Sequence, residues 1–340
     1  MTARLRRAAL LVTAVGVFIL FSACDQPGPQ WFWERPETDF ARTIQGLFSQ
    51  IVYIAVLVFI VVEGALLWAV LRFRRGANTK MPPQFHGSTN MEIAWTIAPA
   101  VILAFIAVPT VRGVFESYPQ TTAGAIQVRA IGHQWWWEFQ YPDLGITTAN
   151  EIVFPAGQRL HIKIESVDVI HGFWIPKFGG KRDAIPTRVN ELAWTAENPG
   201  IYYGQCSQLC GTSHANMRLR AVVKDAAGWD AWVKSMKDAN GTPAATAPED
   251  VKKGYQLVST GACVGCHTIQ GTGLKARVGP DLTRFGERTT LGSGIYPNDD
   301  AHLVRWLKDP LGSKAGNKMP NLQLTDEDAA AIAAYLRSLK

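Results

Sequence analysis

Hydrophobic positions gather into three long blocks in the first third of the chain. The first block, residues 8–21, follows a basic start, and this pattern is typical of a secretory signal peptide over residues 1–23. The other two blocks, at 47–71 and 93–111, are long enough to cross the hydrocarbon core of a membrane, which is about 30 Å thick. We therefore expect residues 24–118 to form an N-terminal segment followed by a two-helix transmembrane hairpin.

Basic residues between the two expected spans indicate how the hairpin is oriented. They are Arg72, Arg74, Arg75 and Lys80. Loops on the cytoplasmic side of a membrane carry an excess of lysine and arginine. Both tails of the hairpin are therefore expected on the outer face, which agrees with an exported N-terminus.

After the second span the pattern changes to period two. Polar and apolar residues alternate without interruption at 159–165, so one face of that strand is expected to be buried and the other exposed. Short strands and turn residues, such as those at 198–200, predict an antiparallel sandwich or barrel over residues 120–239. On this alternation His161 is a surface residue and not a ligand. Met217 points inward if its strand starts there.

The last part of the chain is predicted to be helical. Apolar residues at helical spacing predict a helix over 225–239, and the polar segment 240–248, rich in proline and alanine, predicts a linker. Residues 249–340 carry further helical patterns and are expected to form a separate domain. Thr325 is expected to cap the last helix.

Composition and charge change this picture little. Apolar residues make up 47% of the 340 residues, but they are concentrated in the early blocks, which indicates a membrane protein. The formal net charge of +6 could suggest a nucleic-acid partner. We expect no such partner, because no basic helix or RNA-binding signature accompanies the charge and part of the excess lies between the two spans.

Five cysteines fall in three places. Two lie in the stretch 206–217 and two in a motif at 263–267, so no pair is left over for a structural disulfide. The fifth, Cys24, ends the apolar leader after Phe-Ser-Ala, which is similar to a bacterial lipobox. Cys24 is therefore predicted to be lipidated. Ordinary cleavage near residue 23 and an uncleaved anchor are the alternatives.

The stretch 206–217 carries the densest chemistry of the chain. Two thiols, one imidazole and one thioether come from Cys206, Cys210, His214 and Met217, and His171 offers a second imidazole upstream. This is the soft set of ligands that copper prefers. Zinc rarely recruits methionine, and a disulfide between the two cysteines would leave histidine and methionine unexplained. The set predicts a two-copper centre with bridging thiolates.

The C-terminal region contains a Cys-x-x-Cys-His motif, formed by Cys263, Cys266 and His267. In an exported chain this motif predicts a covalently bound haem c, with two thioether links and the histidine as a ligand of the iron. Met319 is the only methionine after the motif and is the expected sixth ligand. His302 is the competing ligand, but it lies in a predicted helix.

These motifs resemble those of the cytochrome c oxidase subunit II family. CSQLCGTSHANM and the upstream IHGFW look like its binuclear CuA site, and the segments GHQWWWEF, DAIP and PGIYYGQ extend the resemblance over roughly residues 40–225. Residues 249–340 resemble a small class I cytochrome c. The resemblance implies a multidomain membrane protein of the branch with a fused cytochrome c (the caa type). Its parts are a transmembrane hairpin, an all-β cupredoxin domain at 120–239 and an all-α cytochrome domain.

The resemblance also implies roles for single residues. Trp135 matches the residue through which electrons enter the copper site, and Glu92 matches one at the mouth of a proton-conducting channel of subunit I. The backbone carbonyl of Gln208 takes the place of a copper ligand. The family usually has glutamate there, and its side chain binds magnesium at the boundary with subunit I. With Gln208, we expect that magnesium site to be weakened or absent.

The function implied by the resemblance is electron transfer in a respiratory chain. Electrons would pass from the haem c of this chain to its CuA and on to haem a of subunit I, where dioxygen is reduced to water coupled to proton translocation. The partners would be subunit I and other oxidase subunits, a cytochrome or respiratory-complex donor, and the bacterial inner membrane. Two alternatives stay open: a subunit of a nitric-oxide- or nitrous-oxide-reducing relative, and a free membrane-anchored electron carrier.

Overall fold

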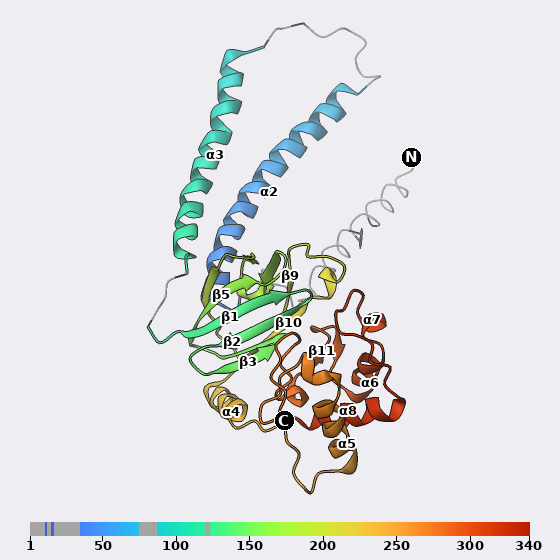
Figure 1. Ribbon diagram of the computed structural model, residues 1–340. Helices are drawn as coiled ribbons and strands as arrows, with labels where there is room; N and C mark the ends of the chain where they lie inside the picture. The colour runs from blue at the N-terminus through green and yellow to red at the C-terminus, as the bar shows by residue number, and fades with distance from the viewer. Residues whose placement is uncertain (1–10, 12–14, 17–34, 75–83, 85–86, 120–122) are drawn as a thin grey trace.

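Two long helices and two packed domains make up the described part of the chain (Figure 1). The computed structural model describes residues 11, 15–16, 35–74, 84, 87–119 and 123–340. Cys24 and most of the expected signal peptide lie outside the described residues, as do Arg75 and Lys80.

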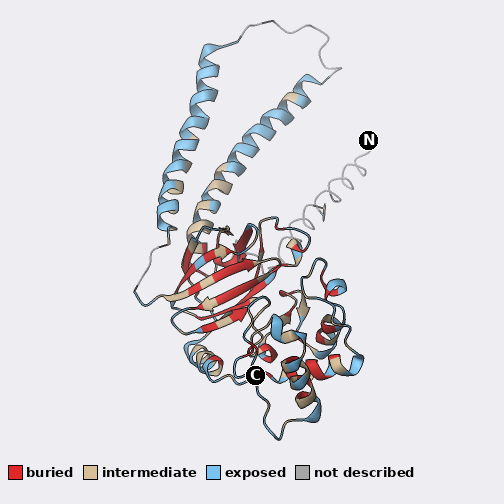
Figure 2. Ribbon diagram, in the orientation of Figure 1, coloured by how far each residue is buried: buried red, intermediate tan, exposed pale blue. Residues whose placement is uncertain are grey.

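The two helices, α2 (Asp39–Phe73) and α3 (Thr89–Glu116), project from the same end of the β-sheet region (Figure 1). Both are long and apolar enough to cross a membrane. Their side chains are largely exposed (Figure 2), as lipid-facing residues are in a protein without its bilayer. Each helix extends beyond the expected span at both ends. Thr38 caps α2 by accepting a hydrogen bond from the backbone N–H of Ala41 at 3.0 Å.

Residues 126–224, called the β-domain here, form two packed five-stranded sheets. The first sheet contains, in spatial order, β3 (Ile146–Ala149), β2 (Trp136–Tyr141), β1 (Ile126–His133), β5 (Arg159–Ser166) and β8 (Asn190–Thr195). The second contains β4 (Glu151–Pro155), β10 (Arg218–Lys224), β9 (Gly200–Cys206), β6 (His171–Trp174) and β7 (Arg182–Ala184). The expected sandwich is present, but β1 pairs with β5 and β4 with β10 in parallel, so it is not purely antiparallel. Long crossover connections between the strands of each pair allow this.

Aromatic side chains fill the space between the two sheets. Trp137, Phe139, Phe173 and Trp194 are among the largest fully buried residues. The expectation that His161 is a surface residue is wrong, because only 2% of its area is exposed. Its strand β5 lies between β1 and β8, and the His161 ring is hydrogen-bonded to side chains of both of these strands, so the outward face is covered there too.

Residues 249–340, called the C-terminal domain here, pack around a hydrophobic core separate from that of the β-domain. The helices are α5 (Glu249–Thr260), α6 (Asp300–Lys308), α7 (Pro310–Ser313) and α8 (Asp326–Ser338), with the short hairpin strands β11 (Thr290–Leu291) and β12 (Tyr296–Pro297). Thr325 caps α8, with the backbone N–H of Asp328 donating to its hydroxyl at 3.1 Å. Together with the two long helices and the sandwich, this helical domain confirms the predicted fold class.

The two domains lie side by side and are joined through α4 (Ala226–Lys237) (Figure 1). Trp229 and Trp232 of α4 stack on each other and pack against Tyr141 of the β-domain. After α4 the chain crosses to the C-terminal domain, where the hydroxyl of Tyr335 donates to the carbonyl of Gly241 at 2.9 Å. The start of the expected linker is thus packed against the domain that follows it.

Candidate functional site

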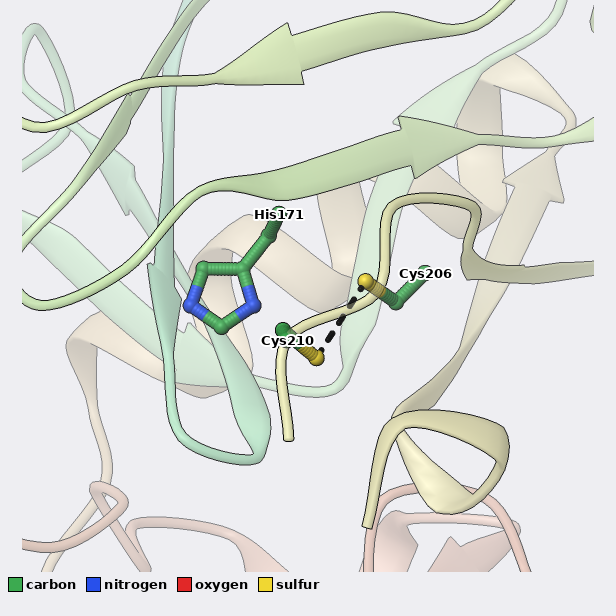
Figure 3. Close-up of side chains that lie close together, drawn as sticks. All are labelled: His171, Cys206 and Cys210. Atoms are coloured by element: carbon green, nitrogen blue, oxygen red, sulfur yellow. Dashed lines mark hydrogen bonds between the residues drawn. The ribbon is translucent and has the colours of Figure 1, made fainter. Parts of the chain in front are cut away.

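Three of the expected copper ligands meet at one end of the β-domain (Figure 3). His171 begins β6, Cys206 ends β9, and Cys210 lies in the loop that follows. The pairing of β6 with β9 places Phe173 opposite Cys206, which brings His171 beside that loop. One ring nitrogen and the two sulfurs lie within 4.8 Å of one another, and the two Sγ atoms are 3.7 Å apart.

The other expected ligands come from the same loop. His214 starts the short helix η2 (His214–Asn216), and its Nδ1 is 3.5 Å from the Sγ of Cys210. Met217 is fully buried, and its backbone carbonyl accepts a hydrogen bond from the N–H of Cys206 at 2.8 Å. The carbonyl oxygen of Gln208 lies 3.2 Å from the Sγ of Cys206. The fold therefore brings His171, Cys206, Cys210 and His214 together, with the backbone of Gln208 and Met217 beside them.

The environment of His171 fits a bound metal. Its Nε2 is 2.8 Å from a carboxylate oxygen of Asp168, whereas its Nδ1 is buried and has no hydrogen-bond partner among the described residues. A buried polar atom left unpaired costs about 1–3 kcal/mol. A metal ion beside the two sulfurs would satisfy this atom.

The two thiols, like His171, fit a bound metal. The hydrogen bond from Cys210 lowers the pKa of Cys206 below its ordinary value, and that same contact raises the pKa of Cys210. Two thiolates this close repel each other, so both are ionised only with positive charge between them. Copper ions supply that charge, and thiolate, imidazole and thioether are ligands that copper accepts.

Asp168 is a site residue that the sequence reasoning missed. Besides holding His171, its carboxylate accepts hydrogen bonds from the backbone N–H groups of Gln134 and Val169, both at 2.7 Å. Burial would raise the pKa of Asp168, but these hydrogen bonds and that of His171 outweigh it and lower the pKa. A metal-binding histidine commonly donates its second N–H to a carboxylate. An acid three residues before His171 was therefore a usable signal.

The three tryptophans at 135–137 lie in different environments. Trp137 is fully buried in the core, and Trp136 stacks on His133 with 4.1 Å between the ring centroids. Trp135 is 9% exposed, and its indole N–H donates to the carbonyl of Cys210 at 3.0 Å. Of the three, Trp135 is the one hydrogen-bonded to the loop that carries the expected copper ligands.

A cavity of about 430 Å³ between the C-terminal domain and the β-domain is the candidate haem site. His267 and Met319 both line it, and most of the remaining wall in this domain is apolar, as a haem requires. The Nδ1 of His267 lies 2.7 Å from the carbonyl of Pro280, which can only accept, so Nε2 is left free for iron. His302 does not line the cavity, and its Nδ1 is hydrogen-bonded to Asp299. This geometry favours Met319 as the sixth ligand.

The same cavity reaches the β-domain. Trp135 and Trp136 form part of its wall. Gly316, three residues before Met319, has a φ of +74°, and a Cβ added there would lie 3.0 Å from the ring of Trp135. Only a glycine lets the loop before Met319 come this close to the indole.

Gln208 and Glu92 lie in different surroundings. The side-chain oxygen of Gln208 accepts a hydrogen bond from Lys181 at 2.9 Å, so a positive charge already stands beside it. Glu92 is exposed in the first turn of α3, at the end of the hairpin remote from the β-domain (Figure 1). The structure does not bring Glu92 together with the other candidate site residues.

Three family models match the chain. The model described as the transmembrane domain of cytochrome c oxidase subunit II matches residues 34–112, and the one for the periplasmic domain of the same subunit matches residues 145–225. A cytochrome c model matches residues 251–340.

Similar proteins carry matching names. A cytochrome c oxidase subunit 2 from Alkalihalophilus pseudofirmus is 35% identical over 327 residues, covering 94% of this chain and 91% of that protein. One from Bacillus sp. PS3 is 36% identical over 290 residues, covering 79% and 80%. A solved periplasmic domain of subunit II of the cytochrome oxidase of Bradyrhizobium japonicum is 34% identical, covering 35% of this chain and 97% of that one, with a TM-score of 0.34.

Proposed function

Because the chain belongs to the cytochrome c oxidase subunit II family, we propose that it carries electrons into a haem–copper oxidase of the caa type. Electrons pass from its own haem c to its binuclear CuA centre and on to haem a of subunit I, where dioxygen is reduced to water coupled to proton translocation. One observation carries the proposal. Trp135 is hydrogen-bonded to the loop of the expected copper ligands and also lines the cavity between His267 and Met319.

The copper ligands in this proposal are His171, Cys206, Cys210, His214, Met217 and the backbone carbonyl of Gln208. A copper pair held by these residues would supply one-electron transfer. Asp168 fixes the ring of His171 through Nε2 and so leaves Nδ1 directed at the sulfurs. Both cysteines are buried, which would keep water away from the proposed copper pair.

The haem ligands are His267 and Met319, with thioether links from Cys263 and Cys266. Burial lowers the pKa of His267, which keeps its imidazole neutral and able to bind iron. The carbonyl of Trp135 accepts hydrogen bonds from two groups of the C-terminal domain, Lys314 Nζ at 2.6 Å and Ser293 Oγ at 2.8 Å. The proposed point of electron entry to copper is thus in direct contact with the domain that would hold the haem.

The same proposal places the chain in the bacterial inner membrane, with both domains on the outer face. Arg72 and Arg74 lie where α2 ends and agree with a cytoplasmic loop. That orientation puts Glu92 near the cytoplasmic surface, where a proton-uptake channel of subunit I would open. Residues 1–23 would be the signal peptide and Cys24 the lipidated first residue of the mature chain.

The remaining boundaries are proposed as follows. Residues 24–118 form the N-terminal segment and hairpin, with membrane spans at about 47–71 and 93–111. The cupredoxin domain covers 120–239, a linker 240–248, and the cytochrome domain 249–340. The start of α5 at Glu249 and the separate core of the C-terminal domain support the last boundary.

Purification of the chain with its natural partners tests the proposal. We expect haem a and a third copper ion to co-purify with the haem c and the CuA pair, because subunit I carries them. A nitric-oxide- or nitrous-oxide-reducing relative, or a free electron carrier, would be isolated without haem a and the third copper. That result would contradict the oxidase assignment.

A further inference from the structure

A short segment of the C-terminal domain, Thr289–Gly294, is hydrogen-bonded to the β-domain at both of its ends. We call it the docking segment. Thr289 and Thr290 contact β4, and Ser293 and Gly294 contact β10. The segment follows Arg288, which lines the proposed haem cavity, so it links that cavity directly to the β-domain.

One carboxylate oxygen holds the first end of the docking segment. Oε1 of Glu151 accepts hydrogen bonds from the backbone N–H of Thr289 at 2.9 Å and its hydroxyl at 2.7 Å. It also accepts from the N–H and the hydroxyl of Thr290, at 3.2 and 3.3 Å. Only 6% of Glu151 is exposed. These donors all come from the other domain, so a carboxylate this deeply buried is satisfied by docking.

The negative charge of Glu151 also supports its contact with the docking segment. Burial lowers the pKa of Arg288, and the negative charges of Asp281 and Glu151 oppose that effect. Glu151 therefore supplies part of the charge that balances an arginine in the wall of the haem cavity. Removal of Glu151 would leave both the arginine and the threonine donors without this partner.

Two arginines of β10 hold the second end of the docking segment. The backbone N–H of Arg218 donates to the carbonyl of Ser293 at 3.0 Å, and the guanidinium of Arg220 donates to the carbonyl of Gly294 at 2.9 Å. Arg220 is itself buried and lies 4.2 Å above the ring of Tyr203. This end keeps Ser293 where its hydroxyl reaches the carbonyl of Trp135.

We propose that Glu151 is a positioning residue of the electron route: it holds the docking segment, and with it the haem cavity, against Trp135. The C-terminal domain is then a fixed part of the subunit rather than a carrier that swings on its linker. The docking itself is independent of the proposed function, and only the statement about the electron route rests on it.

Hydrogen exchange of the full chain in its assembled, haem- and copper-loaded complex tests the docking. In Glu151→Ala we expect the backbone amides of 285–298 to exchange about tenfold faster, because hydrogen bonds to a charged acceptor are lost. Glu151→Gln keeps an acceptor oxygen without the charge and should give a smaller effect. Glu165→Gln is the matched control, since the partner of Glu165 is Arg129 within the β-domain.

The rate of electron transfer between the haem and copper centres, measured after rapid reduction of the haem, tests the positioning role. We expect it to fall about tenfold in Glu151→Ala and less in Glu151→Gln, following the loss of the docked state, while the absorption of both centres stays unchanged. Wild-type protection of 285–298 in both variants, with both centres intact, would overturn the docking claim. Faster exchange with an unchanged rate would overturn the positioning role. Failure of the proposed function would appear separately, as missing haem a and third copper.

Discussion

At the scale of single residues, backbone and side chain can serve different purposes in one amino acid. The carbonyl of Gln208 lies beside Cys206, in the proposed copper site, while its side-chain amide points to Lys181. A backbone carbonyl is present whatever the side chain, so glutamine in place of the glutamate usual in the family leaves the proposed copper ligand in place. Only binding that depends on the side chain at position 208 is expected to be weakened.

We therefore expect a complete CuA centre next to a weakened or absent magnesium site. Magnesium prefers carboxylate and water oxygens, and the ammonium of Lys181 already occupies one side of the Gln208 amide. Manganese offered in place of magnesium to the assembled complex measures the affinity. Gln208→Glu should raise that affinity about tenfold without altering the CuA spectrum. Tight manganese binding by the wild type, or copper loss in Gln208→Ala with the fold intact, would contradict this account.

At the scale of helices and strands, local pattern predicted much of what the structure shows. Apolar residues at helical spacing over 225–239 predicted α4, and Thr325 predicted the start of α8. The exposure of His161 was predicted wrongly, because it depends on which strands flank β5, and those come from distant parts of the chain. An alternating pattern indicates that the two faces of a strand differ, but it does not indicate whether side chains of neighbouring strands cover the outward face.

Some residues of the candidate site could be suggested from sequence alone and others could not. Most of the proposed ligands could be suggested from sequence because they lie in two short motifs, 206–217 and 263–267, each with its own chemistry. His171 and Met319 lie outside these motifs and were suggested by the resemblance and by the lack of another methionine after the second motif. Asp168 lies near His171 in sequence and could have been found by looking for its carboxylate partner. The contacts of Glu151 with Thr289 and of Lys314 with Trp135 could not, because the paired residues are far apart in the chain and belong to different domains.

The C-terminal domain should fold as a cytochrome on its own. It has a hydrophobic core separate from that of the β-domain, and it carries all of the proposed haem ligands, so residues 249–340 are expected to bury their core side chains without the β-domain. Matured in a host that attaches haem, the excised fragment should show a low-spin spectrum with a methionine–iron charge-transfer band near the red edge. Met319→Ala should abolish that band while the covalent haem remains. Persistence of the band would exclude Met319 as the ligand.

At the scale of the whole molecule, the arrangement brings the proposed haem cavity beside the proposed copper site, at the end of two helices long and apolar enough to cross a membrane. The carbonyl of Trp135 is held by Lys314 and Ser293, and Gly316 lies against its ring. The C-terminal domain thus covers the residue through which electrons would enter the copper site. A donor from outside is expected to deliver electrons to the haem rather than to Trp135.

Deletion of residues 249–340 tests the central claim most directly, because it removes the proposed haem c and leaves the proposed copper ligands in place. A fused donor is present at a high effective concentration, so its loss should lower turnover with the natural donor by about tenfold or more. Small artificial reductants should still drive the truncated oxidase at the wild-type rate, because they reach the copper site directly. Copper content, oxygen consumption with the natural donor and oxygen consumption with the small reductant are measured on the same preparation. A fully copper-loaded truncated enzyme that turns over with its natural donor as fast as the wild type would contradict the account.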